Sequence, residues 1–294
     1  EVFQGESSEI LIREAMRFID SAKKADKPFF TIVWFGSPHE PYSGLPADLA
    51  LYDDLPAKYT KKVKLTSNET GGPTTRPQGE VLRERYAEIT AMDRAIGTLR
   101  QHLATEGLRD NTLVFYCGDN GTSGDAALGF PHRGVKGQMY EGGILVPGLI
   151  EWPARIPQPR TTSVRATTSD LLPTLCAITG QPLPARPIDG IDQLGWWTGA
   201  ALRSAREGFL FYIKSELRAA KWRHWKLHFV FESEPNQGTR HLETPWLFNI
   251  KRDPKEETDA AMEDGWVRGP MRRMVMAFEP SSAATRVRPP GMTR

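Results

Sequence analysis

The stretch LVFYCGDNG, residues 113–121, carries the strongest structural signal in the sequence. Its first part, Leu113–Tyr116, is short, β-branched and aromatic and is flanked by turn residues, which predicts a buried strand. Asp119 and Asn120 follow where this strand ends. In open α/β sheets ligands collect at the carboxyl ends of the strands, and carboxylate and amide oxygens suit calcium or magnesium. The stretch therefore predicts an α/β fold with a metal site at this edge of the sheet.

A basic, glycine-rich segment lies a short distance downstream. It reads RGVKG at residues 133–137 and YEGG at residues 140–143. Arginine and lysine bind oxyanions through charge-assisted hydrogen bonds. A pair of hard oxygen ligands followed by a cationic loop outlines a metal-assisted hydrolase of an oxyanion ester. Asn120-Gly121 is also a hairpin signal, so the pair by itself leaves a simple turn open.

The overall composition is that of an ordinary globular protein, with 39% hydrophobic and 25% charged residues over 294 positions. The net charge of +2 favours neither a nucleic-acid partner nor an anionic membrane, so no nucleic acid is expected, and no apolar run approaches the length of a membrane span. Cys117 and Cys176 are the sole cysteines, which excludes a disulfide framework and a cysteine zinc cluster. One bridge between them remains possible, but two buried free thiols are favoured.

The elements upstream of residue 113 predict a parallel sheet. Pro28–Phe35 is a near-continuous apolar run, as in a central strand that is covered on both faces. The apolar stripe from Leu82 to Leu103 predicts a helix that ends at Gly107. Strand, helix and strand form a crossover unit, which favours parallel strands with helices on both faces. Parallel pairing would bring His39 and Asp119, which follow the two strands, to one edge of the sheet.

The remaining predicted elements complete a large first domain, residues 1–199. We expect helices over Ser8–Ala22 and Ser169–Gly180, with Ser7 or Ser8 as the N-cap of the former and Ser169 as that of the latter. Val146–Trp152 is expected to be a third strand. The polar stretch Tyr42–Gly79 reads as a long loop that is functional or mobile.

Beyond about Gly199 the apolar segments become short and alternating or aromatic, as in antiparallel strands. Residues 200–278 are predicted to form a small α+β subdomain, and Glu279–Arg294 a loose tail. The subdomain's expected elements are strands over Phe209–Tyr212, Lys226–Phe231 and Trp246–Ile250 and a helix over Met271–Phe278.

The order of the motifs resembles the type I sulfatases of the alkaline-phosphatase superfamily. The matching pieces are PHEP (38–41), MD (92–93), DNTLV (110–114), DNG (119–121), RGVKG (133–137), YEGGI (140–144), VP (146–147), DLLPTL (170–175), KWR (221–223), WKL (225–227), LFNI (247–250) and DP (253–254). The resemblance implies an α/β fold with a helix-sandwiched, mostly parallel sheet, a smaller C-terminal antiparallel sheet and a helix.

The same resemblance assigns roles to the polar residues. Asp119 and Asn120 correspond to the second pair of ligands of a divalent cation, usually Ca²⁺, with Mg²⁺ possible. His39 corresponds to the histidine near the leaving oxygen, and Lys136 to the lysine that neutralises the sulfate. Both are predicted to be catalytic and to bind substrate. Arg133 is predicted to bind substrate, although it could instead only pin the loop.

The sequence departs from the family in one respect. The family's nucleophile is a formylglycine made within a Cys/Ser-x-Pro-x-Arg motif, and this sequence has no such motif. The paired aspartates of the family's first strand are absent as well. The resemblance thus implies the C-terminal part of a longer protein, with the formylglycine in the missing half. A fragment of this kind is expected to be inactive alone and to bind metal weakly.

The expected activity is hydrolysis of sulfate esters, with a sulfated small molecule or carbohydrate as substrate. The alternatives are a phosphodiesterase or phosphonate monoester hydrolase, and a non-catalytic anion-binding fragment or pseudoenzyme. The family suggests a periplasmic, secreted or lysosome-like compartment, and the oligomeric state stays open. Glu141 is expected to order its loop by accepting backbone hydrogen bonds, and His132 to lie at the surface.

Overall fold

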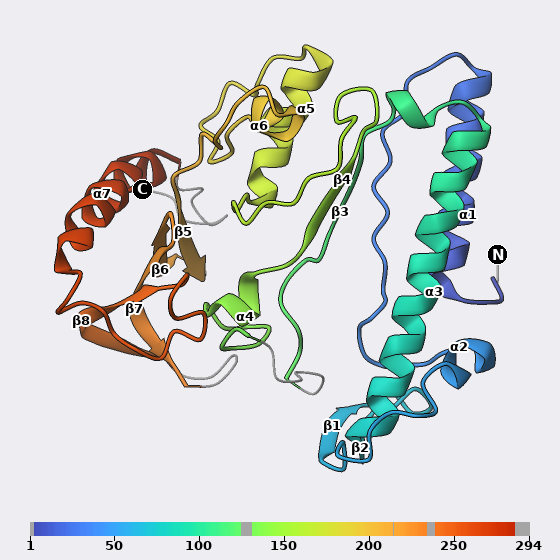
Figure 1. Cartoon of the computed structure of the whole chain (residues 1–294), viewed down its shortest axis with the longest axis horizontal. Helices are drawn as coiled ribbons and strands as arrows, with labels where there is room; N and C mark the ends of the chain where they lie inside the picture. Colours follow the sequence, from blue (N-terminus) through green and yellow to red (C-terminus); the bar gives the residue numbers. More distant parts are fainter. Residues whose placement is uncertain (1–2, 125–130, 214, 234–238, 286–294) are drawn as a thin grey trace, which may run out of the picture. The chain divides into compact units, whose positions relative to one another are not determined.

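The computed structural model describes residues 3–124, 131–213, 215–233 and 239–285 (Figure 1). The chain divides into two compact units. The first unit comprises Glu1–Phe115, Ser123–Leu128 and Ile150–Ala154, and the remaining residues form the second unit. His39 therefore lies in the first unit, whereas the other candidate site residues, Asp119, Asn120, Arg133 and Lys136, lie in the second.

Two long helices dominate the first unit. α1 spans Ser7–Lys24, and α3 spans Gln78–Thr105. α1 buries Ile12, Ala15 and Ile19, because residues three and four apart lie on the same face of a helix. The two helices pack along each other (Figure 1). Both predicted helices are thus confirmed, and a short 3₁₀ turn, Arg109–Asn111, follows α3.

The ends of these helices agree only partly with the prediction. Ser7 or Ser8 as the N-cap of α1 was wrong, because Glu6 Oε2 accepts a hydrogen bond from Glu9 N at 3.0 Å. Ser8 Oγ instead donates to Glu6 Oε1 at 3.1 Å. A carboxylate can accept both donors, and the positive end of the helix dipole stabilises its charge. Gly107, after α3, has a φ of +67°, as expected for the residue that terminates a helix.

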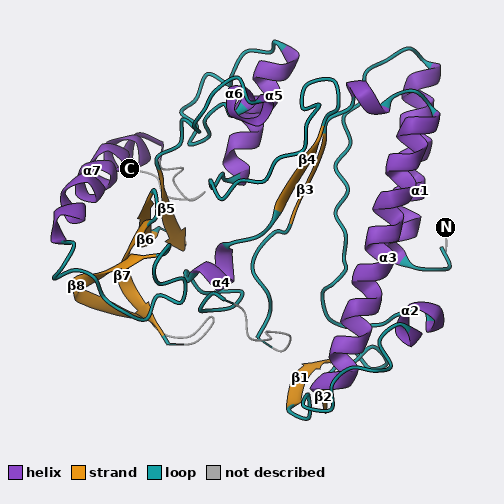
Figure 2. Cartoon of the chain, viewed as in Figure 1, coloured by secondary structure: helices purple, strands orange, loops and turns teal. Residues whose placement is uncertain are grey.

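The central strand predicted over Pro28–Phe35 was wrong. The segment is drawn as a loop in Figure 2, and no strand among the described residues pairs with it. Its side chains do alternate as in a strand, and Phe30, Ile32 and Trp34 are 66%, 61% and 84% exposed. A strand needs a neighbouring chain to satisfy its backbone groups, so apolar composition alone does not create one.

The long loop predicted over Tyr42–Gly79 was also wrong. This stretch contains a short helix, α2 (Pro46–Ala50), and an antiparallel hairpin of β1 (Lys62–Thr66) and β2 (Pro73–Pro77). Val63 and Leu65 of β1 form a small core with Tyr42 and with Val81 of α3. The few apolar residues of the stretch alternate in β1, and this pattern was short enough to be overlooked.

Glu88 is a buried acid on the inner face of α3. Its side chain is 7% exposed, and Oε1 accepts a hydrogen bond from Ser43 N at 2.8 Å. Its other oxygen, Oε2, is buried and has no hydrogen-bond partner in the described part of the chain. Burial raises the pKa of Glu88 to about 7, and the bonds from Ser43 only partly oppose this. The fold therefore favours the protonated carboxyl group.

Glu88 should make the stability of the protein fall as the pH rises. Its pKa is raised in the folded state, so its stabilising contribution is complete below pH 4.5 and is lost as the pH rises through about 7. The loss has an upper limit of about 3 kcal/mol. Denaturant unfolding at about pH 5 and about pH 8 measures it. Glu88→Gln should remove most of the fall, whereas Asp93→Asn, on the exposed side of α3, should not. An equal fall in all three proteins would contradict the prediction.

A two-stranded sheet of β3 (Val114–Cys117) and β4 (Gly148–Glu151) carries the strand on which the sequence analysis rests. Both strands confirm predicted ones, with slightly different ends. Asp119 and Asn120 follow β3 directly, as expected. A single helical turn, α4 (Glu141–Ile144), lies between β3 and β4 in the sequence.

The second unit continues with short helices. They are a 3₁₀ turn (Thr168–Asp170), α5 (Leu171–Thr179) and α6 (Leu194–Thr198). The N-cap prediction at Ser169 was wrong. The N-cap residue of α5 is Asp170, and Thr167 caps the preceding 3₁₀ turn, where it forms a capping box with Asp170. Asp170 suits this position because its carboxylate reaches back to Thr167 N, at 3.3 Å, which a serine hydroxyl at 169 does not do.

A four-stranded antiparallel sheet ends the second unit and confirms the predicted small sheet. Its order is β5 (Gly208–Ile213), β6 (Glu216–Trp222), β7 (Trp225–Glu232) and β8 (Thr239–Asn249). A second 3₁₀ turn (Gly265–Val267) leads into α7 (Arg268–Thr285), which packs on β6. The core between sheet and helix contains Ala220, Trp225, Leu227, Leu247, Val267 and Met271. The fold is therefore mixed α/β with a C-terminal antiparallel sheet and helix.

α7 extends into the stretch Glu279–Arg294, which was predicted to be a loose tail. The backbone of α7 continues to Thr285, since Ala283 and Ala284 favour helix, and residues 286–294 lie outside the described part. None of the helices in the described ranges is long and apolar enough to cross a membrane.

Candidate active site

The predicted metal ligands lie at the end of β3. Asp119 is exposed, Asn120 is half-buried, and Asp119 Oδ1 accepts a hydrogen bond from Asn120 N at 2.8 Å. No group of three or more His, Cys, Asp or Glu side chains in the described ranges is arranged to hold a metal ion. Calcium takes six to eight oxygen ligands. The chemistry of the two side chains fits a hard cation, but they form only part of a ligand set.

Backbone hydrogen bonds join the Asp119-Asn120 segment to the Lys136 segment. Lys136 N donates to Thr122 O at 2.8 Å, and Gly121 N donates to Gly143 O at 2.8 Å. Within the loop, Gly142 N donates to Arg133 O at 2.7 Å. The structure thus brings together the two segments that carry the predicted ligands and the predicted cation, which lie about 15 positions apart in the sequence. We call residues 131–143 the lysine loop.

Arg133 has partners that pin the lysine loop. Its Nη1 donates to Glu256 O at 3.0 Å, and its guanidinium lies over the ring of Tyr140 at 4.3 Å from the centroid. Such a cation–π contact holds the arginine in one orientation. The two roles predicted for Arg133 were substrate binding and loop pinning. The contacts support pinning, and substrate binding stays a prediction.

His39 lies on an exposed turn of the first unit. Its Nδ1 is 2.7 Å from Glu40 O, and its backbone N donates to Gly36 O at 3.1 Å. A carbonyl oxygen can only accept, so Nδ1 carries the proton. The other ring nitrogen, Nε2, is then an acceptor in the neutral ring and a donor in the imidazolium. His39 belongs to a different unit from the other candidates, so its role stays a prediction.

Glu141, at the start of α4, is fully buried and paired with cations. Its carboxylate lies 2.7 Å from Lys221 Nζ, 3.2 Å from Lys226 Nζ and 3.1 Å from Arg165 Nη2. Burial would raise the pKa of Glu141, but Lys226 and Lys221 lower it to about 2. Burial in turn lowers the pKa of Lys221 to about 8. The prediction that Glu141 accepts backbone hydrogen bonds was wrong, because a buried charge is stabilised best by opposite charges.

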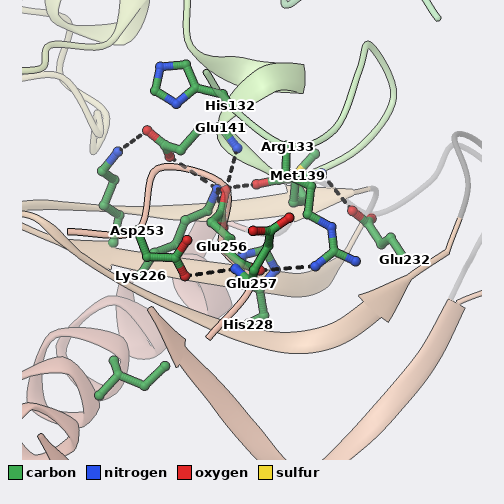
Figure 3. Close-up of polar contacts among 12 residues, drawn as sticks. His132, Arg133, Met139, Glu141, Lys226, His228, Glu232, Asp253, Glu256 and Glu257 are labelled. Carbon is green, nitrogen blue, oxygen red and sulfur yellow. Dashed lines mark hydrogen bonds and ion pairs between the residues drawn. The ribbon is translucent and has the colours of Figure 1, made fainter. Parts of the chain in front are cut away.

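Glu256 continues this buried network to the C-terminal sheet (Figure 3). Its Oε2 is 2.6 Å from His228 Nε2 and 3.3 Å from Lys226 Nζ, both on β7. Burial would raise the pKa of Glu256, but the bond from His228 and the charge of Lys226 keep it below its ordinary value. Burial lowers the pKa of His228. Nε2 of His228 donates its proton to Glu256 Oε2, since a carboxylate can only accept.

Apart from Glu141, the members of this network were not predicted from the sequence; they are Arg165, Lys221, Lys226, His228 and Glu256. Lys221 and Lys226 stand inside the motifs KWR and WKL, and Glu256 follows DP (253–254) by two positions. A charged residue within an otherwise apolar strand was the available signal. His132, which was expected at the surface, is half-buried, with Nδ1 at 3.2 Å from Pro254 O.

The two cysteines are free and half-buried, which confirms free thiols and rules out a bridge between them. Burial raises the pKa of the Cys117 thiol, and the neighbouring charge of Asp119 raises it further. A thiol in this state is a weak nucleophile. The end of β3 therefore carries two oxygen-bearing side chains, Asp119 and Asn120, beside a loop with two cationic residues, and Cys117 is a poor candidate for a nucleophile there.

Together, the α/β fold, the oxygen pair after β3 and the adjoining cationic loop are the features expected of a hydrolase that acts on oxyanion esters. Residues 2–181 match the family model described as Sulfatase, and residues 204–280 match the model described as the C-terminal region of aryl-sulfatase. The chain therefore belongs to the sulfatase family, which confirms the resemblance to the type I sulfatases of the alkaline-phosphatase superfamily.

Individual relatives agree with the family match. Arylsulfatase D of Homo sapiens is 30% identical over 200 residues, which cover 57% of this chain and 34% of the relative. The PsFucS1 sulfatase from Pseudoalteromonas sp. has a similar structure, with a TM-score of 0.74, 25% identity, and coverage of 94% of this chain and 53% of that one.

A second solved structure shows the fold alone. BT4656, in complex with its substrate D-glucosamine-2-N,6-O-disulfate, has a TM-score of 0.71 at 17% identity, over 97% of this chain and 72% of that one. The chain spans about a third of the length of the curated relatives that it matches.

Proposed function

We propose that the protein containing this chain hydrolyses sulfate esters and that the chain supplies the second half of its metal-dependent site. The observation that carries the proposal is the hydrogen bonding of the lysine loop to the Asp119-Asn120 segment, through Lys136 N–Thr122 O and Gly121 N–Gly143 O. This bonding holds a cation-bearing loop against a pair of hard oxygen ligands. Membership of the sulfatase family supports the choice of a sulfate ester over a phosphate or phosphonate ester.

Asp119 and Asn120 would hold Ca²⁺, or Mg²⁺, together with ligands from outside the described residues. When bound, such a cation supplies Lewis-acid polarisation and a template for the sulfate oxygens. The exposed carboxylate and the amide are the hard oxygen donors that these ions prefer. The sequence has no Cys/Ser-x-Pro-x-Arg motif that could be modified to formylglycine. The formylglycine nucleophile is therefore proposed and is not identified with any residue of this chain.

The chain's own side chains would bind the ester and move one proton. Lys136 would lie against the sulfate oxygens and offset the negative charge that increases in the transition state. Arg133 would keep the loop in place and add positive charge. Protonated His39 would donate its Nε2 proton to the leaving oxygen, since Nδ1 is engaged with Glu40 O.

The substrate is proposed to be a sulfated carbohydrate or an aryl sulfate. The sulfated sugar bound by BT4656 is compatible with the former, and the arylsulfatase relatives with the latter. A purified full-length protein assayed on an aryl sulfate, a sulfated monosaccharide, and phosphate monoesters and diesters distinguishes these cases. Turnover of a phosphodiester without turnover of any sulfate ester would contradict the proposal.

Lys136→Ala should lower kcat/KM for an aryl sulfate about 100-fold, because it removes a cation from the developing charge. The measurement is steady-state hydrolysis by full-length wild type and variant at equal metal loading. Lys251→Ala, which removes an exposed lysine of the same unit, serves as the control and should leave kcat/KM unchanged. If both variants matched the wild type, Lys136 would not bind the reacting sulfate.

A further inference from the structure

The lysine loop is attached to the C-terminal sheet through several backbone groups. Met139 N donates to Glu232 Oε2 at 2.6 Å, and Glu141 N donates to Glu256 Oε1 at 2.7 Å. Met139 O accepts a hydrogen bond from Lys226 Nζ. The backbone of the loop is therefore held by side chains from β7 and from the segment after β8, which belong to the C-terminal region.

Glu256 makes two hydrogen bonds to the lysine loop, one with its side chain and one with its backbone (Figure 3). Its Oε1 accepts from Glu141 N, and its carbonyl oxygen accepts from Arg133 Nη1 at 3.0 Å. Its Oε2 is bonded to His228 Nε2 at 2.6 Å and paired with Lys226 at 3.3 Å. One buried residue thus contacts both ends of the Arg133–Glu141 stretch and, on its other side, strand β7.

The backbone of Glu256 is in an unfavourable conformation. Its φ is +53°, in the left-handed region, and the residue is fully buried. Non-glycine residues are strained in this region, and glycine would avoid that strain. Glycine has no carboxylate, however, and could not join Glu141 N to His228 and Lys226. The strained backbone thus occurs at a residue whose carboxylate binds Glu141 N with one oxygen and His228 and Lys226 with the other.

Charge explains why an acid is needed at this position. Glu141 and Glu256 are buried beside Lys221 and Lys226, whose side chains are 3% and 0% exposed. Removal of one carboxylate would leave a buried ammonium group without its full complement of negative charge, and the surrounding segments would move to let water in. The lysine loop would be affected most directly, because it contains Glu141 and is hydrogen-bonded to Glu256.

We propose that Glu256 is a positioning residue for the sulfatase site: by fixing Arg133 and Glu141 to strand β7, it sets the position of the Lys136-bearing loop. The C-terminal region, on this inference, is part of the machinery that orients the ester. The inference rests on the proposed function. It requires Glu256 to act through the loop and not through contact with substrate.

The test compares Glu256→Gln with wild type in the full-length protein. Glutamine keeps the volume and one acceptor for Glu141 N but removes the charge. We expect amide hydrogen exchange in residues 131–143 to become about tenfold faster or more, and kcat for an aryl sulfate to fall about 10- to 100-fold. Glu257→Gln is the matched control, because Glu257 is exposed and adjacent. It should change neither quantity.

Assays are run well below the unfolding midpoint of each protein, so that loss of folded protein does not contribute. A variant with a lowered midpoint but unchanged loop exchange and unchanged kcat would show a merely structural role and overturn the inference. Faster exchange with unchanged kcat would overturn it as well. If Glu256→Gln does not fold, Glu256→Asp, which keeps the charge but retracts the oxygens, should give a smaller loss in the same two quantities.

An inactive wild type would separate the two proposals. In that case the proposed function fails, while loop exchange in Glu256→Gln still decides whether Glu256 fixes the lysine loop. If the wild type is active and the Glu256 variants keep its loop exchange and kcat, the proposed function stands and the positioning role of Glu256 does not.

Discussion

Replacing Asp170 by alanine is expected to lower the free energy of unfolding by about 3–5 kcal/mol. Asp170 is 1% exposed, and its carboxylate accepts hydrogen bonds from Arg206, Ile191 N and Gln193 Nε2, the last two at 2.9 Å and 3.1 Å. The Arg206 side chain is 9% exposed, so alanine would leave a buried guanidinium without its carboxylate. The cost of that unpaired charge dominates the effect.

Denaturant unfolding of wild type and variants measures this effect. Asp189→Ala is the matched control, because Asp189 is exposed and contributes only its carbonyl oxygen to Arg206, at 2.7 Å. It should change stability by less than about 0.5 kcal/mol. Adding Arg206→Met to Asp170→Ala should cost less than the sum of the single changes, since the charges then disappear together. An additive result would contradict a dominant ion pair.

Local patterns were sufficient for much of the fold. The apolar stripe of α3 and the short run that became β3 depend on residues close in sequence, so both could be predicted from composition and spacing. The segment Pro28–Phe35 failed for the opposite reason. A strand is defined by its hydrogen-bonded neighbour, and no property of the segment itself reveals whether a neighbour is present.

Strand β6 shows a second limit. Its sequence, ELRAAKW, contains Lys221, a residue that is rarely buried and therefore argued against a half-buried strand. Lys221 is 2% exposed because Glu141, 80 positions away, lies at 2.7 Å. Long-range charge pairing of this kind cannot be read from a single sequence, because either partner alone looks like a surface residue.

In the candidate site, too, some residues could be predicted from local sequence and others could not. Asp119, Asn120 and Lys136 could be proposed because they stand beside a predicted strand and within glycine-rich turns. The residues that hold their segments, chiefly Glu256 and Lys226, come from the C-terminal sheet and the loop after it. Their importance follows from contacts that form only after folding, so the sequence suggested candidate site residues but not the buried residues that hold the lysine loop.

Gly121→Ala should destabilise the protein by about 3 kcal/mol or more and reduce kcat/KM about 100-fold. A Cβ atom at position 121 would lie 1.9 Å from Gly142 O and 2.7 Å from Gly142 C. Both atoms belong to backbone, so no side-chain rotation can relieve the contact. The segment after β3 has to move away from the lysine loop, and the bond between Gly121 N and Gly143 O, now 2.8 Å, would be lost.

Gly97→Ala is the appropriate control for this change. Gly97 lies on the exposed side of α3, and nothing comes within 4 Å of the added Cβ atom. Alanine there should raise stability by about 0.5–1 kcal/mol, because it favours helix. Thermal unfolding and aryl sulfate turnover of both variants decide the matter. If Gly121→Ala kept wild-type turnover, the two backbone segments could separate without loss of function, and their hydrogen bonding would no longer support a shared site.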